Sequence, residues 1–123
     1  MAKAPKPVRP KVSEKQIEAT ILAFLSKLKN CKVWKNQTTG IYDPTRKVYR
    51  SLRGKYSGKG SSDILACIEG RMICVEVKRP VGAVVSLDQV RFINEIKLAG
   101  GIAFVAKSVD DVRTALMEHN LIR

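Results

Sequence analysis

The sequence predicts a single α/β domain in which a mixed β-sheet is flanked by helices. The expected order of elements along its 123 residues is helix, three strands, helix, strand, helix. The strand–helix–strand unit from Met72 to Ala106 indicates a right-handed crossover between two parallel strands of one sheet. In the hairpin before it, both alternating sets of side chains are apolar, so helices should cover both faces of the sheet.

Residues 1–12 are predicted to form a flexible basic arm ahead of this domain, which spans residues 13–123. Pro5, Pro7 and Pro10 stand between four basic residues in the arm, and proline at this density prevents a helix. The arm is either a solvated tail or a segment that contacts phosphates.

The first helix is expected from about residue 14 to residue 29. Ser13 and Gln16 fit a capping box at its start. Apolar residues then recur at helical spacing, at Ile17, Ile21, Phe24, Leu25 and Leu28. A short strand should follow at residues 32–36.

The segment from residue 37 to residue 62 is polar and rich in glycine, lysine and arginine. Part of it is expected to form a hairpin around Pro44–Lys47, and the rest to form an ordered or mobile loop. A loop of this length inside a compact domain usually serves binding.

Two β-rich runs, residues 63–68 and 72–78, predict a tight hairpin because only Glu69-Gly70-Arg71 separates them. Pro80 then ends the second strand, since proline cannot donate to the ladder. A second helix should follow from Ser86 to Gly100-Gly101, then a strand at residues 102–106 and a last helix capped by Ser108. The expected inward-facing residues are Leu87, Val90, Ile93 and Ile96 in the second helix and Val109, Val112, Leu116 and Met117 in the last.

The net charge of +12 comes from 23 basic and 11 acidic residues, and it is one-sided. Residues 1–60 hold 15 basic and 3 acidic side chains, whereas residues 61–123 hold 8 of each. Such a field attracts polyanions, which favours nucleic acid as the partner. An anionic membrane surface is the weaker alternative, because the basic half contains no clean amphipathic helix. The sequence also lacks a membrane-length apolar run, and its N-terminus lacks the apolar segment of a signal peptide.

The three cysteines, Cys31, Cys67 and Cys74, are expected to be small buried apolar residues in a reducing compartment. None belongs to a C-x-x-C pair, and His119 is the only histidine. A zinc site would need more ligands at tighter spacing, so zinc is not expected.

Two acids and a lysine should meet at one end of the central hairpin. If the hairpin folds about Glu69-Gly70, opposed residues have numbers that sum to 139, as those of Asp63 and Glu76 do. Opposed residues share a face of the sheet, and Lys78, two residues beyond Glu76, lies on that face as well. A divalent cation would remove the repulsion between the carboxylates, and this oxygen-rich site suits Mg²⁺ or Mn²⁺. The alternative is an ordinary Glu–Lys surface pair.

The segment Gly60-Ser61-Ser62-Asp63 with Glu76-Val77-Lys78 resembles the G-x-x-D…E-x-K core of the PD-(D/E)XK nucleases, and more narrowly their VRR-NUC branch. Ser62 stands where the general motif often has proline. The resemblance extends to Glu18, Trp34-Lys35-Asn36, residues 86–89 and residues 100–105. It implies a restriction-endonuclease-like core with the order α-β-β-β-α-β-α.

The resemblance also implies roles for single residues. Asp63, Glu76 and the Val77 main-chain carbonyl would hold the metal, and Lys78 would position the attacking water. Glu18 would help to hold the metal, directly or through water, although helical geometry leaves Glu14 equally well placed.

A second group of residues carries supporting roles. Gln89 would support the lysine or a nearby phosphate, and it also fits a capping box with Ser86. Contacts to nucleic acid are expected at Lys35, Asn36, Arg53, Lys55, Lys59 and Arg79.

The predicted function is a Mg²⁺- or Mn²⁺-dependent endonuclease acting on DNA, without an organic cofactor. The resemblance implies a 5′-phosphate product and branched substrates such as Holliday junctions, with a role in repair, recombination or replication. It also implies a homodimer in the cytoplasm of a bacterial or phage-infected cell. The alternatives are a non-catalytic nucleic-acid-binding protein and a nuclease for duplex DNA or RNA.

Overall fold

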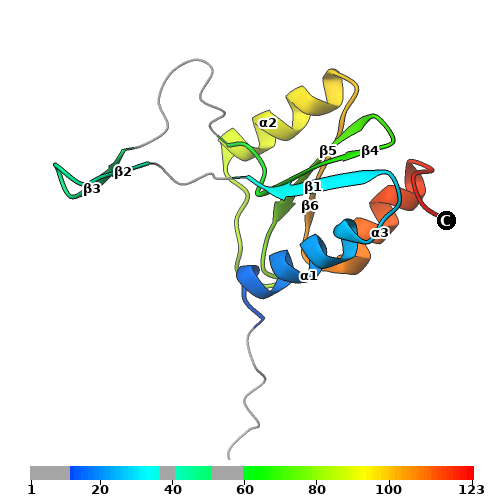
Figure 1. The fold of residues 1–123 in the computed structure, drawn as a ribbon, viewed down its shortest axis with the longest axis horizontal. Helices are drawn as coiled ribbons and strands as arrows, with labels where there is room; N and C mark the ends of the chain where they lie inside the picture. Colours follow the sequence, from blue (N-terminus) through cyan, green and yellow to red (C-terminus); the bar gives the residue numbers. More distant parts are fainter. Residues whose placement is uncertain (1–11, 37–40, 51–59) are drawn as a thin grey trace, which may run out of the picture.

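In a computed structural model, residues 12–36, 41–50 and 60–123 are described. The elements in chain order are α1 (Glu14–Ser26), β1 (Cys31–Lys35), β2 (Ile41–Asp43), β3 (Val48–Arg50), β4 (Ile64–Ile68), β5 (Arg71–Val77), α2 (Leu87–Leu98), β6 (Ile102–Ala106) and α3 (Val109–Glu118). The predicted α/β class with a mixed sheet is confirmed (Figure 1). The basic arm, except for residue 12, lies outside the described residues.

The main sheet has four strands in the order β1-β4-β5-β6. β4 is antiparallel to β1 and to β5, and β6 is parallel to β5, as the strand–helix–strand pattern predicts. The hairpin expected around Pro44–Lys47 is present as a separate two-stranded sheet of β2 and β3. The element order therefore has two strands more than the sequence order predicted.

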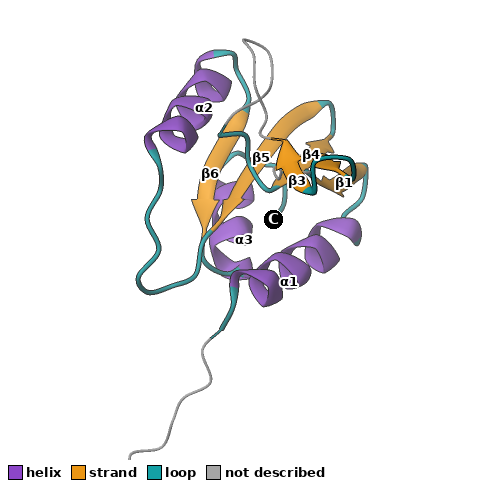
Figure 2. Cartoon of the chain, turned by 90° about the vertical axis from the view of Figure 1, so that its left-hand side faces the viewer, coloured by secondary structure: helices purple, strands orange, loops and turns teal. Residues whose placement is uncertain are grey.

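Helices pack on both faces of the sheet, as expected from its apolar central strands. α1 and α3 lie on one face and α2 on the other (Figure 2). The larger core cluster lies under α1 and α3 and includes Ile21, Leu25, Ile64 and Leu116. A smaller cluster under α2 joins Cys74, Ile93 and Ala103. None of the helices in the described ranges reaches the length and apolarity that a bilayer crossing requires.

α1 begins at the predicted capping box of Ser13 and Gln16, but it ends at Ser26 rather than near residue 29. Asn30 adopts a left-handed conformation with φ of 54°, which turns the chain into β1. Leu28 still packs against the larger core cluster from this turn. The hydrophobic periodicity thus continues past the helix that it predicts.

The buried faces of α2 and α3 differ in part from the prediction. Leu87 and Val90 are 83% and 41% exposed, whereas Ile93 is buried where α2 packs on the sheet. α2 is rotated so that Gln89, one turn before Ile93, faces the sheet in place of Val90. In α3, Val112 and Leu116 are buried, but Met117 is exposed because it follows Leu116 by one position around the helix.

Of the three cysteines, only Cys74 is buried as expected. Burial raises the pKa of the Cys74 thiol to about 11. Cys67 is exposed and Cys31 is half-buried. The prediction for Cys67 was wrong because α2 packs over β5 and β6 and leaves its part of β4 uncovered.

Candidate active site

The candidate site lies at one end of the β4–β5 hairpin. Glu69 and Gly70 connect the strands with φ angles of 50° and 84°, as in a two-residue type I′ turn. This turn sets the register in which Ile64 pairs with Val75, so the expected sum of 139 is confirmed within the ladder. It therefore brings Asp63, just before β4, next to Glu76 in β5.

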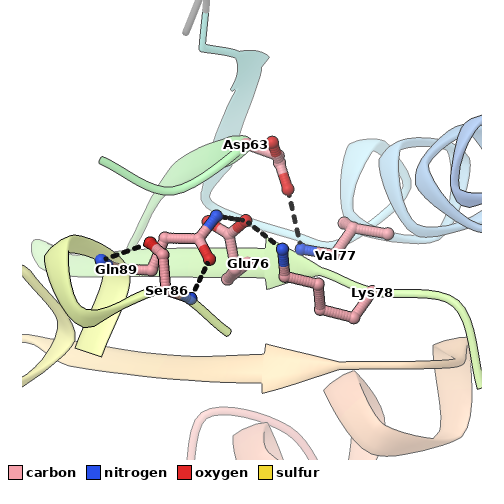
Figure 3. A network of polar contacts seen from close by, with 6 residues as sticks. All are labelled: Asp63, Glu76, Val77, Lys78, Ser86 and Gln89. Carbon is pink, nitrogen blue, oxygen red and sulfur yellow. Dashed lines mark hydrogen bonds and ion pairs between the residues drawn. The ribbon is translucent and has the colours of Figure 1, made fainter. Parts of the chain in front are cut away.

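Asp63 is held by backbone groups of both neighbouring strands. Its carbonyl oxygen accepts a hydrogen bond from the Asn36 N–H at 2.8 Å, which extends the β1–β4 ladder by one residue. Its Oδ2 accepts from the Val77 N–H at 2.9 Å (Figure 3). The carboxylate is thus fixed at the end of β5 rather than directly above Glu76.

Glu76 is the most buried charged residue of the described chain, with 2% of its surface exposed. Its Oε1 accepts a hydrogen bond from Gln89 Nε2 at 2.6 Å and lies 3.8 Å from Lys78 Nζ (Figure 3). Its Oε2 is buried without a hydrogen-bond partner among the described residues. One carboxylate oxygen is therefore held in place while the other still lacks a partner.

The environment of Glu76 disfavours its negative charge. Burial raises the pKa of the carboxyl to about 8, and the neighbouring Asp63 carboxylate raises it further through its charge and through side-chain hydrogen bonding that favours the protonated form. Lys78 opposes this shift, and Glu14 adds to it. A buried carboxylate in this state is one that a bound cation stabilises, because the cation supplies the missing positive charge.

Gln89 forms the capping box that the sequence predicted, and its side chain also contacts Glu76 rather than the predicted Lys78. Its Oε1 accepts from the Ser86 N–H at 2.9 Å, and Ser86 Oγ accepts from the Gln89 N–H, which completes the capping box of α2. Its Nε2 simultaneously donates to Glu76. The first turn of α2 is thereby attached to the carboxylate rather than to Lys78.

The two acids of α1 lie in different surroundings. Glu18 forms an ion pair with Lys35, with its Oε1 3.0 Å from Lys35 Nζ. Glu14, the geometric alternative, is one of the groups that raise the pKa of Glu76. Within the three described ranges, no set of three His, Cys, Asp or Glu side chains is close enough to hold a metal ion. In these ranges Asp63 and Glu76 thus form an acidic pair without a third acidic side chain close enough to complete such a set.

Several of the predicted nucleic-acid contacts are engaged within the protein. Lys35 binds Glu18, and the Asn36 amide donates to Ser61 Oγ at 2.8 Å and to the Ser62 carbonyl at 3.0 Å. The guanidinium of Arg79 donates to the carbonyls of residues 81 and 82. The predicted contacts Arg53, Lys55 and Lys59 lie outside the described residues.

Sequence reasoning missed how the segment before Asp63 is fixed. The Asn36 side chain holds it from β1, and Ser62 is fully buried with an Oγ that has no partner in the described structure. Gly60, with φ of 79°, lies so close to α2 that a Cβ there would be 2.4 Å from the Asp88 carbonyl oxygen. The glycine of the G-x-x-D pattern signals this approach, but no local pattern predicts the contact of Asn36, because β1 and β4 are far apart in sequence.

The fold has a counterpart among solved structures. No family model and no curated protein matches the sequence. A solved structure described as a VRR_NUC domain protein superposes with a TM-score of 0.56 and 15% sequence identity, over 88% of this chain and 88% of that chain. The chain therefore has the fold of a VRR_NUC domain protein, with Asp63, Glu76 and Lys78 gathered at the end of its central hairpin.

Proposed function

We propose that this chain is a metal-dependent endonuclease that hydrolyses phosphodiester bonds in DNA. The observation that carries the proposal is the buried Glu76 carboxylate, which lies beside Asp63 and Lys78 and has one oxygen without a hydrogen-bond partner in the described part of the chain. A fold similar to that of a VRR_NUC domain protein and the charge of +12 support it.

The residues present fit a hard divalent cation. Asp63, Glu76 and the Val77 carbonyl would hold Mg²⁺ or Mn²⁺, and Glu18 would contribute through water. Two carboxylates without a third acidic ligand agree with Mg²⁺, which usually keeps several waters. When bound, the ion supplies positive charge that stabilises the phosphate oxygens in the transition state.

The chain's own side chains position the reactants. Lys78 is 13% exposed at its side chain and orients the attacking water from the edge of the acidic pair. The water attacks phosphorus as the bond to the 3′ oxygen breaks, which leaves a 5′-phosphate and a 3′-hydroxyl. Gln89 holds the Glu76 carboxylate in a single orientation throughout.

The substrate in this proposal is branched DNA, of which a Holliday junction is one candidate, cut by a homodimer. The described residues contain no recognisable motif that reads base edges, so selection rests on the shape and backbone of the substrate. Two copies would place two sites on two strands. Sedimentation as a monomer, or equal cutting of linear duplex and four-way junction, would contradict this part of the proposal.

A non-catalytic nucleic-acid-binding protein is the second candidate. It is favoured by the ion pair between Glu18 and Lys35, which occupies the third acidic side chain. The net charge supports binding in both cases and therefore does not separate the two candidates.

Cleavage of branched DNA in Mg²⁺ and in Mn²⁺ separates them. We expect the wild type to cut. Lys78→Ala should cut at least about 100-fold more slowly, because it loses the group that orients the water. Lys97→Ala is the matched control, since it removes an exposed lysine from the last turn of α2. An intact substrate with the wild type in both metals would contradict the nuclease proposal.

A further inference from the structure

Trp34 lies on the face of the sheet that carries the acidic site, yet it is 42% exposed. In the β1–β4 ladder it pairs with Leu65, whose other partner is Cys74 beneath α2. Directly opposed residues share a face of the sheet, so Trp34 lies on the α2 side. Its exposure shows that α2 does not cover this part of that face.

The uncovered region follows from where α2 packs. α2 contacts β5 and β6, and Figure 2 shows it on the β6 side of the sheet, away from β1. The part of this face formed by β1 and β4, here called the open face, includes Trp34, half-buried Leu65 and exposed Cys67. An exposed tryptophan among apolar neighbours is the kind of surface that binds a ligand.

The open face is continuous with the acidic site. Leu65 is two residues after Asp63, and the hydrogen bond from the Asn36 N–H to the Asp63 carbonyl continues the same register. Trp34 is therefore the diagonal cross-strand neighbour of Asp63 on one face, with Cβ atoms about 7 Å apart. The side chains of Trp34 and Asp63 are therefore neighbours on the same face of the sheet.

The charges around Trp34 favour a polyanion. Lys32 is exposed two residues before it on the same face, and Lys78 flanks the acidic pair on the other side. Proteins bind unpaired nucleotides with aromatic rings that stack on the bases, set in a surface whose basic side chains attract the phosphates.

We propose that Trp34 stacks on an unpaired nucleobase next to the bond that is cleaved. This inference rests on the proposed function and names the substrate more closely: a branched nucleic acid with a single-stranded segment at the branch, such as a fork or flap. Bases within a duplex are stacked on each other and do not offer a free face to the indole. A fork should therefore be preferred over a four-way junction in which every arm is fully paired.

Trp34 is the single tryptophan of the chain, so its emission reports on this surface alone. The experiment titrates the full chain, without divalent cation, with single-stranded oligothymidylate and with a blunt duplex of equal length. Saturation is followed independently by the anisotropy of a labelled oligonucleotide. We expect the single strand to quench the emission by about half or more through stacking, and the duplex to quench it little.

Two variants test whether the ring itself binds. Trp34→Ala should weaken binding of the single strand about 5- to 100-fold and leave binding of the duplex unchanged, whereas Trp34→Phe should retain most of the affinity. Met117→Ala is the matched control, because Met117 is 48% exposed on α3 at the other face. The wild-type titration needs no variant, so a folding defect of Trp34→Ala does not affect it.

The outcomes separate this inference from the proposed function. Saturated binding of the single strand without quenching, or equal quenching by the duplex, would overturn the inference. The emission could instead change with protein concentration alone and not on adding the oligonucleotide. That result would overturn the inference and would indicate that Trp34 contacts a second copy of the chain. Cleavage on later addition of Mg²⁺ would in those cases leave the nuclease proposal standing. Quenching by the single strand without any cleavage would support the stacking surface and contradict the nuclease.

Discussion

The Glu76 carboxylate is energetically costly to bury in its ionised form. The residues on either side of it in β5 are buried and apolar, and one oxygen of its buried carboxylate has no hydrogen-bond partner among the residues that the structure describes. Such a group lowers the stability of the metal-free fold whenever it is ionised. We interpret this cost as one that a bound cation offsets.

Replacing this carboxyl by an amide should reveal that cost. Because the folded-state pKa is about 8 against an ordinary 4.5, the folded chain retains a proton that the unfolded chain loses. The free energy of unfolding of the metal-free wild type should therefore fall as pH rises from about 4.5 to about 8. Glu76→Gln lacks this loss, so at pH near 8 it should be more stable than the wild type by about 1–3 kcal/mol.

Thermal unfolding at low and high pH, with and without Mn²⁺, measures this effect. At low pH the two proteins should be of similar stability, and Mn²⁺ should raise the Tm of the wild type at high pH only. Equal pH dependence in the wild type and Glu76→Gln would contradict the account of this carboxyl.

Gln89 allows its two hydrogen-bonding roles to be separated. Ser86→Ala removes the cap but keeps the Gln89 side chain, so it should cost about 1 kcal/mol of stability and leave the cleavage rate nearly unchanged. Gln89→Ala keeps the Ser86 Oγ cap, which binds the backbone N–H of residue 89, but it removes the side-chain bond to Glu76. It should therefore lower activity about 10- to 100-fold at limiting metal. Cleavage rates over a range of Mn²⁺ concentrations measure the activity of both variants, and chemical denaturation measures their stability. Equal activity losses in the two variants would show that the bond from Gln89 to Glu76 has no role of its own.

The sequence predicted which residues meet at the candidate site, but it did not predict all of their contacts. The meeting of Asp63, Glu76 and Lys78 follows from a two-residue turn and the period of two, both of which are local. The contacts of Glu18 with Lys35 and of Asn36 with Ser62 depend on how β1 and α1 pack, which no local pattern specifies.

The β4–β5 hairpin and the start of α2 together form the frame of the site. The hairpin register is set by its turn, where Gly70 has a φ of 84° and open space around it. Gly60 also has a positive φ, of 79°, but it touches the Asp88 backbone. These two glycines therefore share a backbone conformation and differ in what surrounds them.

Alanine at each glycine should have different consequences. Gly70→Ala should cost about 1 kcal/mol from the backbone strain and leave cleavage intact. Gly60→Ala adds a clash with backbone atoms, so it should cost about 2 kcal/mol or more and shift the α2 start that carries Gln89. Chemical denaturation and cleavage assays of the two variants test this. A Gly60→Ala protein as active and as stable as Gly70→Ala would contradict the proposed frame.

The elements themselves were predicted well wherever caps and turns specify them. Ser13, Ser86 and Ser108 each cap the expected helix. The buried face of α2 was predicted wrongly, because apolar spacing favoured Val90 whereas a hydrogen bond brings polar Gln89 to the sheet.

The excess positive charge of the chain lies in residues 1–60, whereas Asp63, Glu76 and Lys78 of the candidate site lie in the second half. The second half of the chain, which carries Asp63, Glu76 and Lys78, has no net charge, so the first 60 residues supply the attraction for a polyanion. In the proposed nuclease, the attraction of DNA and the chemistry therefore depend on different parts of the sequence.

Deleting residues 2–12 tests the contribution of the basic arm. The deletion removes four basic residues, so the slope of log affinity against log salt should become shallower by about 3–4 if each contacts a phosphate. The Tm should not change, because the arm was predicted to lie outside the domain. An unchanged salt slope would show that the arm is a solvated tail.

The class of the whole fold was predictable because it depends on the order of elements. That order indicated the parallel β5–β6 pair and helices on both faces, which the structure has. The open face was not predictable, because it depends on how far α2 extends across the sheet, a property of packing rather than of pattern.

The most direct test of the central claim is the anomalous scattering of Mn²⁺ in crystals of the wild type soaked in that ion. We expect a peak at coordination distance from carboxylate oxygens of both Asp63 and Glu76, with Lys78 beside it and no ion on the opposite face. Crystals without a peak there, or with Mn²⁺ bound only elsewhere, would contradict the claim that these two acids hold a metal.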